Sequence, residues 1–128
     1  MKYYFEKRME APFAEAEKRV REALGNEGFG VLTEIDVQAT MKKKLDVDFP
    51  RYLILGACNP PFAHKALQIE NKIGTMLPCN VVVQETADGS VEVSAVDPVA
   101  SMQAIDSPGL AEVAGEIRRK LQKVIAAL

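Results

Sequence analysis

The chain has 128 residues, 48% of them hydrophobic and 27% charged, and its formal net charge is −2. This length and composition are typical of one globular domain that can bury a core without disulfide bonds. A charge so close to zero gives no general attraction to nucleic acid or to an anionic membrane, and no apolar run approaches the length of a transmembrane helix. We therefore expect a single domain over residues 1–128 that binds neither nucleic acid nor membrane.

The first residues and the cysteines bear on the cellular compartment. Residues 1–9 carry several charges and lack the long apolar core of a signal peptide. Two cysteines without an export signal indicate reduced thiols rather than a disulfide framework. The expected location is the cytoplasm.

The first part of the chain predicts a strand, a helix, a second strand and a weaker helix. Residues 3–9 alternate as in a strand, and Pro12 suits the first turn of a helix that ends at a glycine. Residues 29–37 alternate cleanly and predict a half-buried strand. Residues 38–46 predict a weaker helix, and its basic run Lys42–Lys44 is typical of a solvated face.

The middle of the chain predicts a strand, a helix and a strand. Residues 52–58 are apolar apart from one glycine, as in a central strand that is covered on both faces. Asn59 can cap the next helix, which reaches about residue 73. Residues 79–85 include three consecutive valines and predict the following strand.

The last part predicts a hairpin strand and a long helix. Asp88-Gly89 marks a hairpin turn, after which residues 91–95 alternate as a strand. Ser107-Pro108 begins the last helix as a cap followed by proline. The predicted order is β-α-β-(α)-β-α-β-β-α, with helices packed on a mixed sheet in an α+β fold.

Four short motifs occur in order along the chain: Gly28-Phe29-Gly30-Val31, Ile54-Leu55-Gly56-Ala57-Cys58-Asn59-Pro60, Leu77-Pro78-Cys79-Asn80-Val81 and Val96-Asp97-Pro98. In this combination the chain resembles the DUF302 family, a domain of unknown function, over essentially its whole length. The resemblance implies a small bacterial or archaeal α+β protein that forms a homodimer. It implies no established activity, so it specifies the fold more than the function.

Cys58 and Asn59 lie between a predicted strand and a predicted helix. Free amides and the helix dipole favour negative charge at a helix N-terminus, and a thiol placed there can have a lowered pKa. One interpretation is therefore a reactive thiol, or a contact for an anion or a metal ion. The other is that Cys58 packs as a small apolar residue while Asn59 only caps the helix.

A second Cys-Asn pair, Cys79 and Asn80, opens the next strand. Residues two apart in a strand share a face, so Cys79 lies on the face of Val81 and Val83. This position favours a buried core cysteine. If the two strands are parallel and joined by a right-handed crossover, Cys58 and Cys79 lie at opposite ends of strands roughly 20 Å long. Both thiols could then bind one metal ion only through an antiparallel return of the chain or a partner subunit.

His64 and Glu70 are candidates of a different kind. His64, the only histidine, falls opposite the predicted apolar face of its helix, which predicts an exposed side chain and leaves a Cys58–His64 dyad as the alternative. Glu70 falls within the apolar arc, near a helix end where the dipole disfavours a carboxylate. It is either a ligand or interface contact or a side chain that reaches water at the edge of the arc.

These features predict a homodimer that binds a small ligand or a metal ion near the Cys58-Asn59-Pro60 turn, with Cys58 as the candidate metal ligand. An apolar sheet face left uncovered by the helices would be buried by a second copy. The alternatives are a thiol-dependent redox protein or enzyme that uses Cys58, and a structural module without a small-molecule site. No motif indicates a cofactor. The candidate ligand-binding residues are Cys58, Asn59, His64, Glu70, Cys79 and Asn80.

Overall fold

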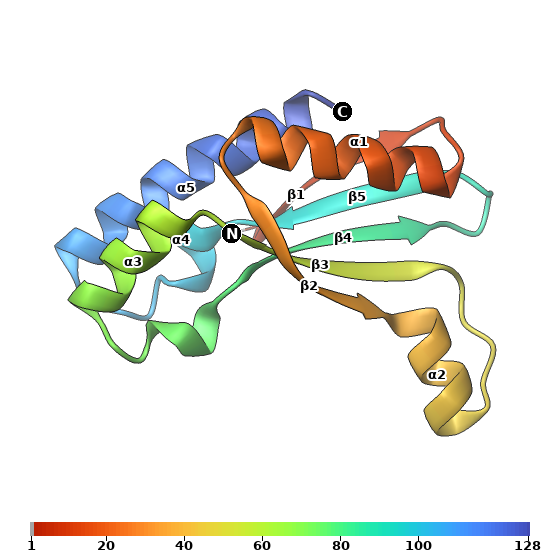
Figure 1. The fold of residues 1–128 in the computed structure, drawn as a ribbon, viewed down its shortest axis with the longest axis horizontal. Coiled ribbons are helices and arrows are strands. Elements are labelled where there is room, and N and C mark those ends of the chain that lie inside the picture. The colour runs from red at the N-terminus through yellow and green to blue at the C-terminus, as the bar shows by residue number, and fades with distance from the viewer. Residues whose placement is uncertain (1) are drawn as a thin grey trace.

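The structure, a computed structural model, describes residues 2–128 (Figure 1). Its elements are β1 (Tyr4–Met9), α1 (Phe13–Asn26), β2 (Gly30–Asp36), α2 (Val37–Leu45), β3 (Tyr52–Cys58), α3 (Pro60–Ile69), the 3₁₀ turn η1 (Ile73–Met76), β4 (Cys79–Glu85), β5 (Val91–Val96), α4 (Pro98–Ser101) and α5 (Pro108–Ala126). The predicted order of strands and helices is confirmed. No helix within the described residues is long and apolar enough to cross a bilayer.

The five strands form one sheet in the order β1-β5-β4-β3-β2 (Figure 1). Every neighbouring pair is antiparallel. The α+β class is confirmed, but the expectation of a mixed sheet is wrong. The reason is the connection from β3 to β4, because α3 and η1 return the chain to the end of the sheet where β3 finished.

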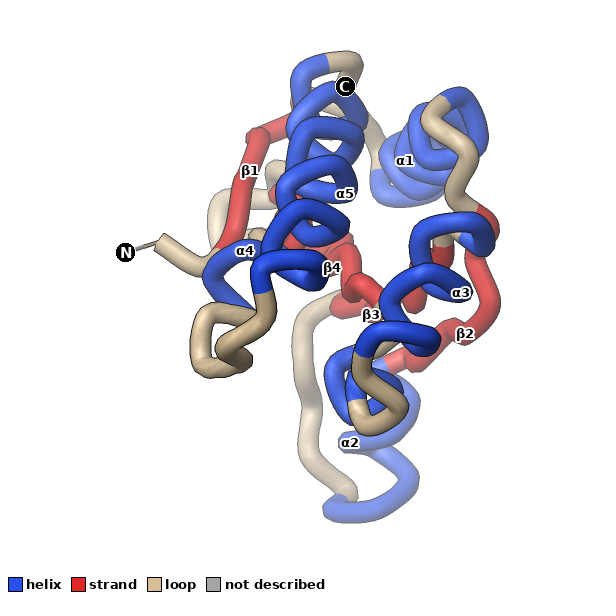
Figure 2. Tube along the Cα trace, turned by 90° about the vertical axis from the view of Figure 1, so that its left-hand side faces the viewer, coloured by secondary structure: helices blue, strands red, loops and turns tan. Residues whose placement is uncertain are grey.

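Helices α1, α3 and α5 cover one face of the sheet (Figure 2). The inward residues of the central strands are buried, among them Leu55, Val81 and Val93, and they pack against Leu24 of α1 and Leu121 of α5. Burying each such side chain stabilises the fold by about 1.5–3 kcal/mol. The core is therefore a single layer between the sheet and three helices.

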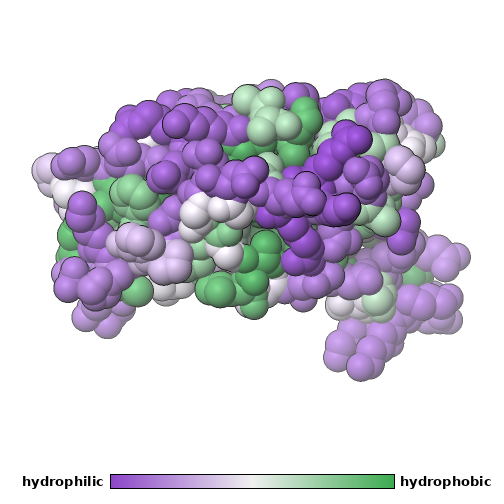
Figure 3. All heavy atoms as spheres, turned by 45° about the horizontal axis from the view of Figure 1, so that its top comes forward, coloured by the Kyte–Doolittle hydropathy of each residue, from purple (hydrophilic) through white to green (hydrophobic). Residues whose placement is uncertain are grey.

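The opposite face of the sheet carries no helix layer. Ile54 and Val82 are only half-buried there, so the expectation that β3 is covered on both faces is wrong. Polar residues lie on the same face, among them Asn80 and Ser94, so the fold leaves a mixed polar and apolar sheet face open. On the helical side, hydrophilic residues dominate the visible surface and hydrophobic patches lie among them (Figure 3).

Strand β2 departs from its predicted pattern. A bulge between Val31 and Thr33 pairs Val31 with Ala57 and Thr33 with Gly56, so the two residues lie on opposite faces of the sheet. All but one residue of β2 are exposed, as expected for an edge strand. The predicted clean alternation and half-burial are therefore wrong, because an extra residue in the strand inverts the parity beyond it.

Helix α2 projects from the end of β2, away from the other helices (Figure 1). The Asp36 carboxylate accepts a hydrogen bond from the Ala39 N–H at 2.9 Å and caps the helix. Asp46 ends it in the left-handed conformation, with φ of 54°. None of its residues is buried, so the expected solvated face for its lysines is confirmed.

Helix α3 ends at Ile69 rather than near residue 73. Glu70 is already extended, with φ of −141°, and Ile73 begins the separate turn η1. Ile73 is nevertheless buried in the core. Its burial explains why the apolar periodicity continues past the end of the helix.

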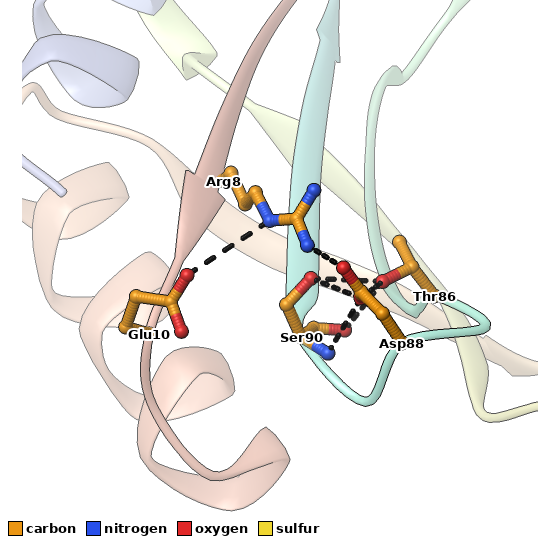
Figure 4. A network of polar contacts seen from close by, with 5 residues as sticks. All are labelled: Arg8, Glu10, Thr86, Asp88 and Ser90. Carbon is orange, nitrogen blue, oxygen red and sulfur yellow. Dashed lines mark hydrogen bonds and ion pairs between the residues drawn. The ribbon is translucent and has the colours of Figure 1, made fainter.

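The predicted hairpin turn between β4 and β5 is confirmed. Gly89 takes a φ of +85°, which only glycine adopts readily. The Asp88 carboxylate accepts hydrogen bonds from the Thr86 hydroxyl at 2.6 Å and from the Ser90 N–H at 3.1 Å, and it also pairs with Arg8 of β1 (Figure 4). This network ties the hairpin to the edge strand.

Candidate functional site

The antiparallel return brings the two cysteines to the same end of the sheet. Ala57 lies directly opposite Cys79 in the β3–β4 pair, and Cys58 is the next residue along β3. Both thiols line one cavity between the sheet and α3. The separation expected for parallel strands is therefore wrong, and the antiparallel arrangement that a shared site requires is present.

This cavity, which we call the thiol cavity, has a volume of about 270 Å³. Its walls are mainly carbon, and the thiols and the Asn59 amide are its polar side chains. The lining residues are Phe29, Leu32, Ala57, Cys58, Asn59, Ala63, Ala66, Leu67, Leu77, Pro78, Cys79, Met102 and Ile117. Apolar walls with a few polar groups are the usual lining of a small-molecule site.

Small side chains on two elements leave the space open. Ala57 of β3 and Ala63 and Ala66 of α3 all line the cavity, where larger side chains would fill it. Leu77 and Pro78, just before β4, also line it. The cavity therefore exists because alanines occupy positions where larger apolar side chains would fill the space.

Asn59 begins α3 but does not cap it. Its side chain makes no cap hydrogen bond; instead Nδ2 donates to the Glu27 carbonyl at 3.2 Å. Asn59 is 8% exposed, and Gly28 beside it has a φ of +82°. The predicted capping role is therefore wrong, because the turn between α1 and β2 lies close enough to take the amide.

The N-terminus of α3 is a poor anion site. Pro60 and Pro61 occupy its first positions and carry no backbone N–H. Two of the donors that a helix start normally offers are therefore missing, and the expectation of free amides beside Cys58 is wrong. What remains near Cys58 is the apolar wall of the cavity.

The two thiols differ in their surroundings. Cys79 is buried, 5% exposed, which confirms the expected core position, whereas Cys58 is half-buried. Burial, and secondarily the charge of Cys58, raise the pKa of the Cys79 thiol from 9.0 to about 11. Cys79 is therefore a neutral thiol at physiological pH. It lies close enough to Cys58 for a charge there to raise the Cys79 pKa.

The chain as a whole matches a known family. The family model described as "Domain of unknown function DUF302" matches residues 5–128. The chain belongs to the DUF302 family. Its structure is similar to that of an uncharacterized conserved DUF302 protein from Bacillus stearothermophilus, with a TM-score of 0.91 and 27% identity over 99% of this chain and 98% of that one. No curated protein matches the sequence.

Only three of the six candidate residues meet at the thiol cavity of this DUF302 domain. His64 lies exposed on α3 and does not line the cavity, so no Cys58–His64 dyad is assembled. Glu70 follows α3, where its carboxylate accepts the Lys72 N–H at 3.0 Å and reaches the surface. Asn80 lies exposed on the open face of the sheet.

Among the described residues, the side chains that usually bind metal ions do not come together at one place. Within residues 2–128, no group of three or more His, Cys, Asp and Glu side chains is placed to hold a metal ion. Met102, which no sequence motif indicates, lines the cavity together with the two cysteines. Nothing in its local sequence marks it, because it follows the short helix α4 and reaches the cavity only through the tertiary fold.

A second hollow, of about 390 Å³, lies on the open face of the sheet. All three tyrosines of the chain line it, together with Glu6 and Glu92. Lys2 lies 5.2 Å from the centre of the Tyr4 ring and 3.7 Å from the Glu6 carboxylate. These contacts fill part of this shallow, mixed surface with the chain's own side chains.

Proposed function

We propose that the thiol cavity binds a small, largely apolar molecule, with Cys58, Cys79 and the Asn59 amide as its polar contacts. The observation that supports this most is the combination of apolar walls and two thiols in one cavity, formed around three alanines. A core evolved only for stability is packed to high density, and leaving space open costs free energy. The open space therefore favours a binding role over a purely structural one.

The size of the cavity limits the ligand. A cavity of roughly 150 Å³ holds a benzene ring, and drug-sized ligands occupy about 300–1,000 Å³. A volume of about 270 Å³ fits a molecule of one or two rings, or a short branched chain. None of the lining residues is an acid or a base of the usual charged kind, so an organic ligand that fits here is uncharged.

A thiol-dependent reaction is the second candidate. Both cysteines line the cavity, but Cys58 is half-buried and Cys79 is buried, so Cys58 is the more accessible thiol for an electrophilic ligand. A general base beside the thiol would be needed to activate it, and the only histidine lies outside the cavity. The geometry therefore supports binding better than catalysis.

A cavity-filling substitution tests the binding proposal. Ala63→Phe would project a ring into the cavity, whereas Ala111→Phe places the same ring on the exposed side of α5. Native mass spectrometry of protein purified from cells without added ligand should show an extra mass on wild type and on Ala111→Phe, and none on Ala63→Phe. An extra mass that persists in Ala63→Phe would contradict binding in this cavity.

We also propose that a second copy covers the open sheet face in a homodimer. Ile54, Val82 and Val96 are half-buried there without a helix over them, and Ile35 beside them is 49% exposed. Burying such a face between two-fold related copies is the commonest solution for small domains. Two free thiols also fit a reducing compartment such as the cytoplasm.

Sedimentation measurements test the homodimer. Val82→Lys places a charge in the middle of the open face, and Ala14→Lys places one on the exposed side of α1. Wild type and Ala14→Lys should sediment as dimers, and Val82→Lys as a monomer. A monomeric wild-type protein would contradict the proposal.

A further inference from the structure

We infer that Cys58, Cys79 and Met102 form a site for a soft monovalent metal ion of the copper(I) class within the thiol cavity. This inference goes beyond the proposed function, since it places a metal ion rather than an organic molecule in the same cavity. The two ligand classes can therefore be separated by experiment.

Three sulfur-containing residues from distant parts of the chain line one cavity. Cys58 ends β3, Cys79 begins β4, and Met102 follows α4. The chain contains only two cysteines, and both line this cavity. Met102 is 5% exposed, so its thioether is directed into the interior rather than to solvent.

The chemistry of these donors selects the metal. Thiolate and thioether ligands are soft and prefer copper(I), whereas calcium, magnesium and manganese prefer oxygen. Structural zinc takes four ligands from Cys, His and carboxylates, and within residues 2–128 no cluster of even three such groups exists. A soft ion that accepts two thiolates and a thioether is the metal class that this donor set fits.

Binding releases two protons. The ion forms bonds to both sulfurs as each thiol loses its proton to solvent, so that Cu⁺ and two thiols give a bis-thiolate complex with a net charge of −1 and two H⁺. The thioether of Met102 adds a bond without losing a proton. Because each thiol loses a proton on binding, metal affinity should rise with pH.

The surroundings support such a complex. Asn59 lines the cavity, and its amide is fixed by the hydrogen bond to Glu27, so it can orient a sulfur ligand. Phe29 and Ile117, both buried, supply apolar walls. A sulfur-rich pocket favours the reduced ion over copper(II), which prefers nitrogen and oxygen ligands.

Competition with the chromogenic copper(I) chelator bicinchoninate under anaerobic conditions tests the inference. Wild type should withdraw one equivalent of Cu⁺ per chain. Cys58→Ala and Cys79→Ala should each weaken binding by about 100-fold, and Met102→Leu, which keeps side-chain volume, by about 10-fold. The matched control Met76→Leu removes a partly exposed thioether outside the cavity and should bind like wild type.

Other outcomes separate the metal site from the proposed function. The two-ring compound indole serves as an apolar probe of the cavity, and its binding is followed by NMR in wild type and in each variant; the same spectra show whether the variants fold. Indole binding without Cu⁺ binding would overturn the metal site and leave the proposed function standing. Equal Cu⁺ affinity in wild type and both folded cysteine variants would overturn it as well. Failure of the wild-type protein to bind either indole or Cu⁺ would overturn both proposals.

Discussion

The side-chain amide of Asn59 donates a 3.2 Å hydrogen bond to the backbone carbonyl of Glu27. This contact joins the start of α3 to the turn that connects α1 and β2. Asn59 also lines the thiol cavity, so the bond fixes one wall of the cavity to the rest of the fold.

Replacing Asn59 by Ala should lower the free energy of unfolding by about 1–2 kcal/mol, because the partly buried carbonyl of Glu27 loses its hydrogen-bond donor. Asn80→Ala provides the control, since Asn80 is the exposed member of the second Cys-Asn pair and its loss should change stability by less than about 0.5 kcal/mol. Urea denaturation measures both. Equal effects of the two substitutions would show that the bond does not stabilise the fold.

Substitution of the glycine beside this bond is expected to destabilise the fold. Gly28 has a φ of +82°, and a Cβ placed there would lie 3.2 Å from the Asn59 Nδ2. Gly28→Ala should therefore destabilise the protein by about 1–2 kcal/mol. Gly115→Ala, in open space within α5, should instead stabilise it by about 0.5–1 kcal/mol. Thermal denaturation that moves both variants in the same direction would contradict this assignment.

The two thiols should react at different rates. Cys58 is half-buried at the cavity wall, and Cys79 is buried with a raised pKa, so little of it is thiolate near neutral pH. In folded protein at pH 8, iodoacetamide should modify Cys58 at least about 10-fold faster than Cys79. Peptide mapping by mass spectrometry gives both rates, and the unfolded protein, in which both should react alike, is the control. A faster Cys79 would contradict the described burial.

Stability should fall at alkaline pH through Cys79. Its pKa is raised from 9.0 to about 11 in the folded state, so the folded protein holds a proton that the unfolded chain releases first. The stabilising contribution is complete below about pH 9 and is lost as pH rises through about 11, up to about 3 kcal/mol in all. The difference in unfolding free energy between wild type and Cys79→Ala, measured by urea from pH 8 to 11, should shrink accordingly. A constant difference across this range would contradict the raised pKa.

The order of elements could be predicted from local patterns, whereas their arrangement in space depends on distant contacts. Strands β3 and β4 have clear apolar runs, and Asp88-Gly89 marks the hairpin that the structure confirms. The antiparallel relation of β3 and β4 depends on where the turn after α3 leads. That path is fixed by the burial of Ile73 against the core, which a local pattern does not reveal.

The candidate site shows the same division. Cys58 and Cys79 could be predicted as candidate site residues from the sequence, because only cysteine carries a thiol and the chain has two. Ala63, Ala66 and Met102 could not, since an alanine marks a cavity only when the groups around it fail to fill the space. The sequence predicts a capping role for Asn59 because capping depends on local residues, but its actual partner Glu27 lies far away in the sequence.

The most direct test of ligand binding by the thiol cavity is a protein-observed NMR titration with indole, in wild type and in Ala63→Phe. Binding in the cavity predicts saturable shifts of backbone amides around Cys58, Ala66 and Cys79 in wild type, and their loss in Ala63→Phe. Ala111→Phe should titrate like wild type. Shifts that are absent in wild type, unchanged in Ala63→Phe, or confined to the open sheet face would contradict binding in this cavity.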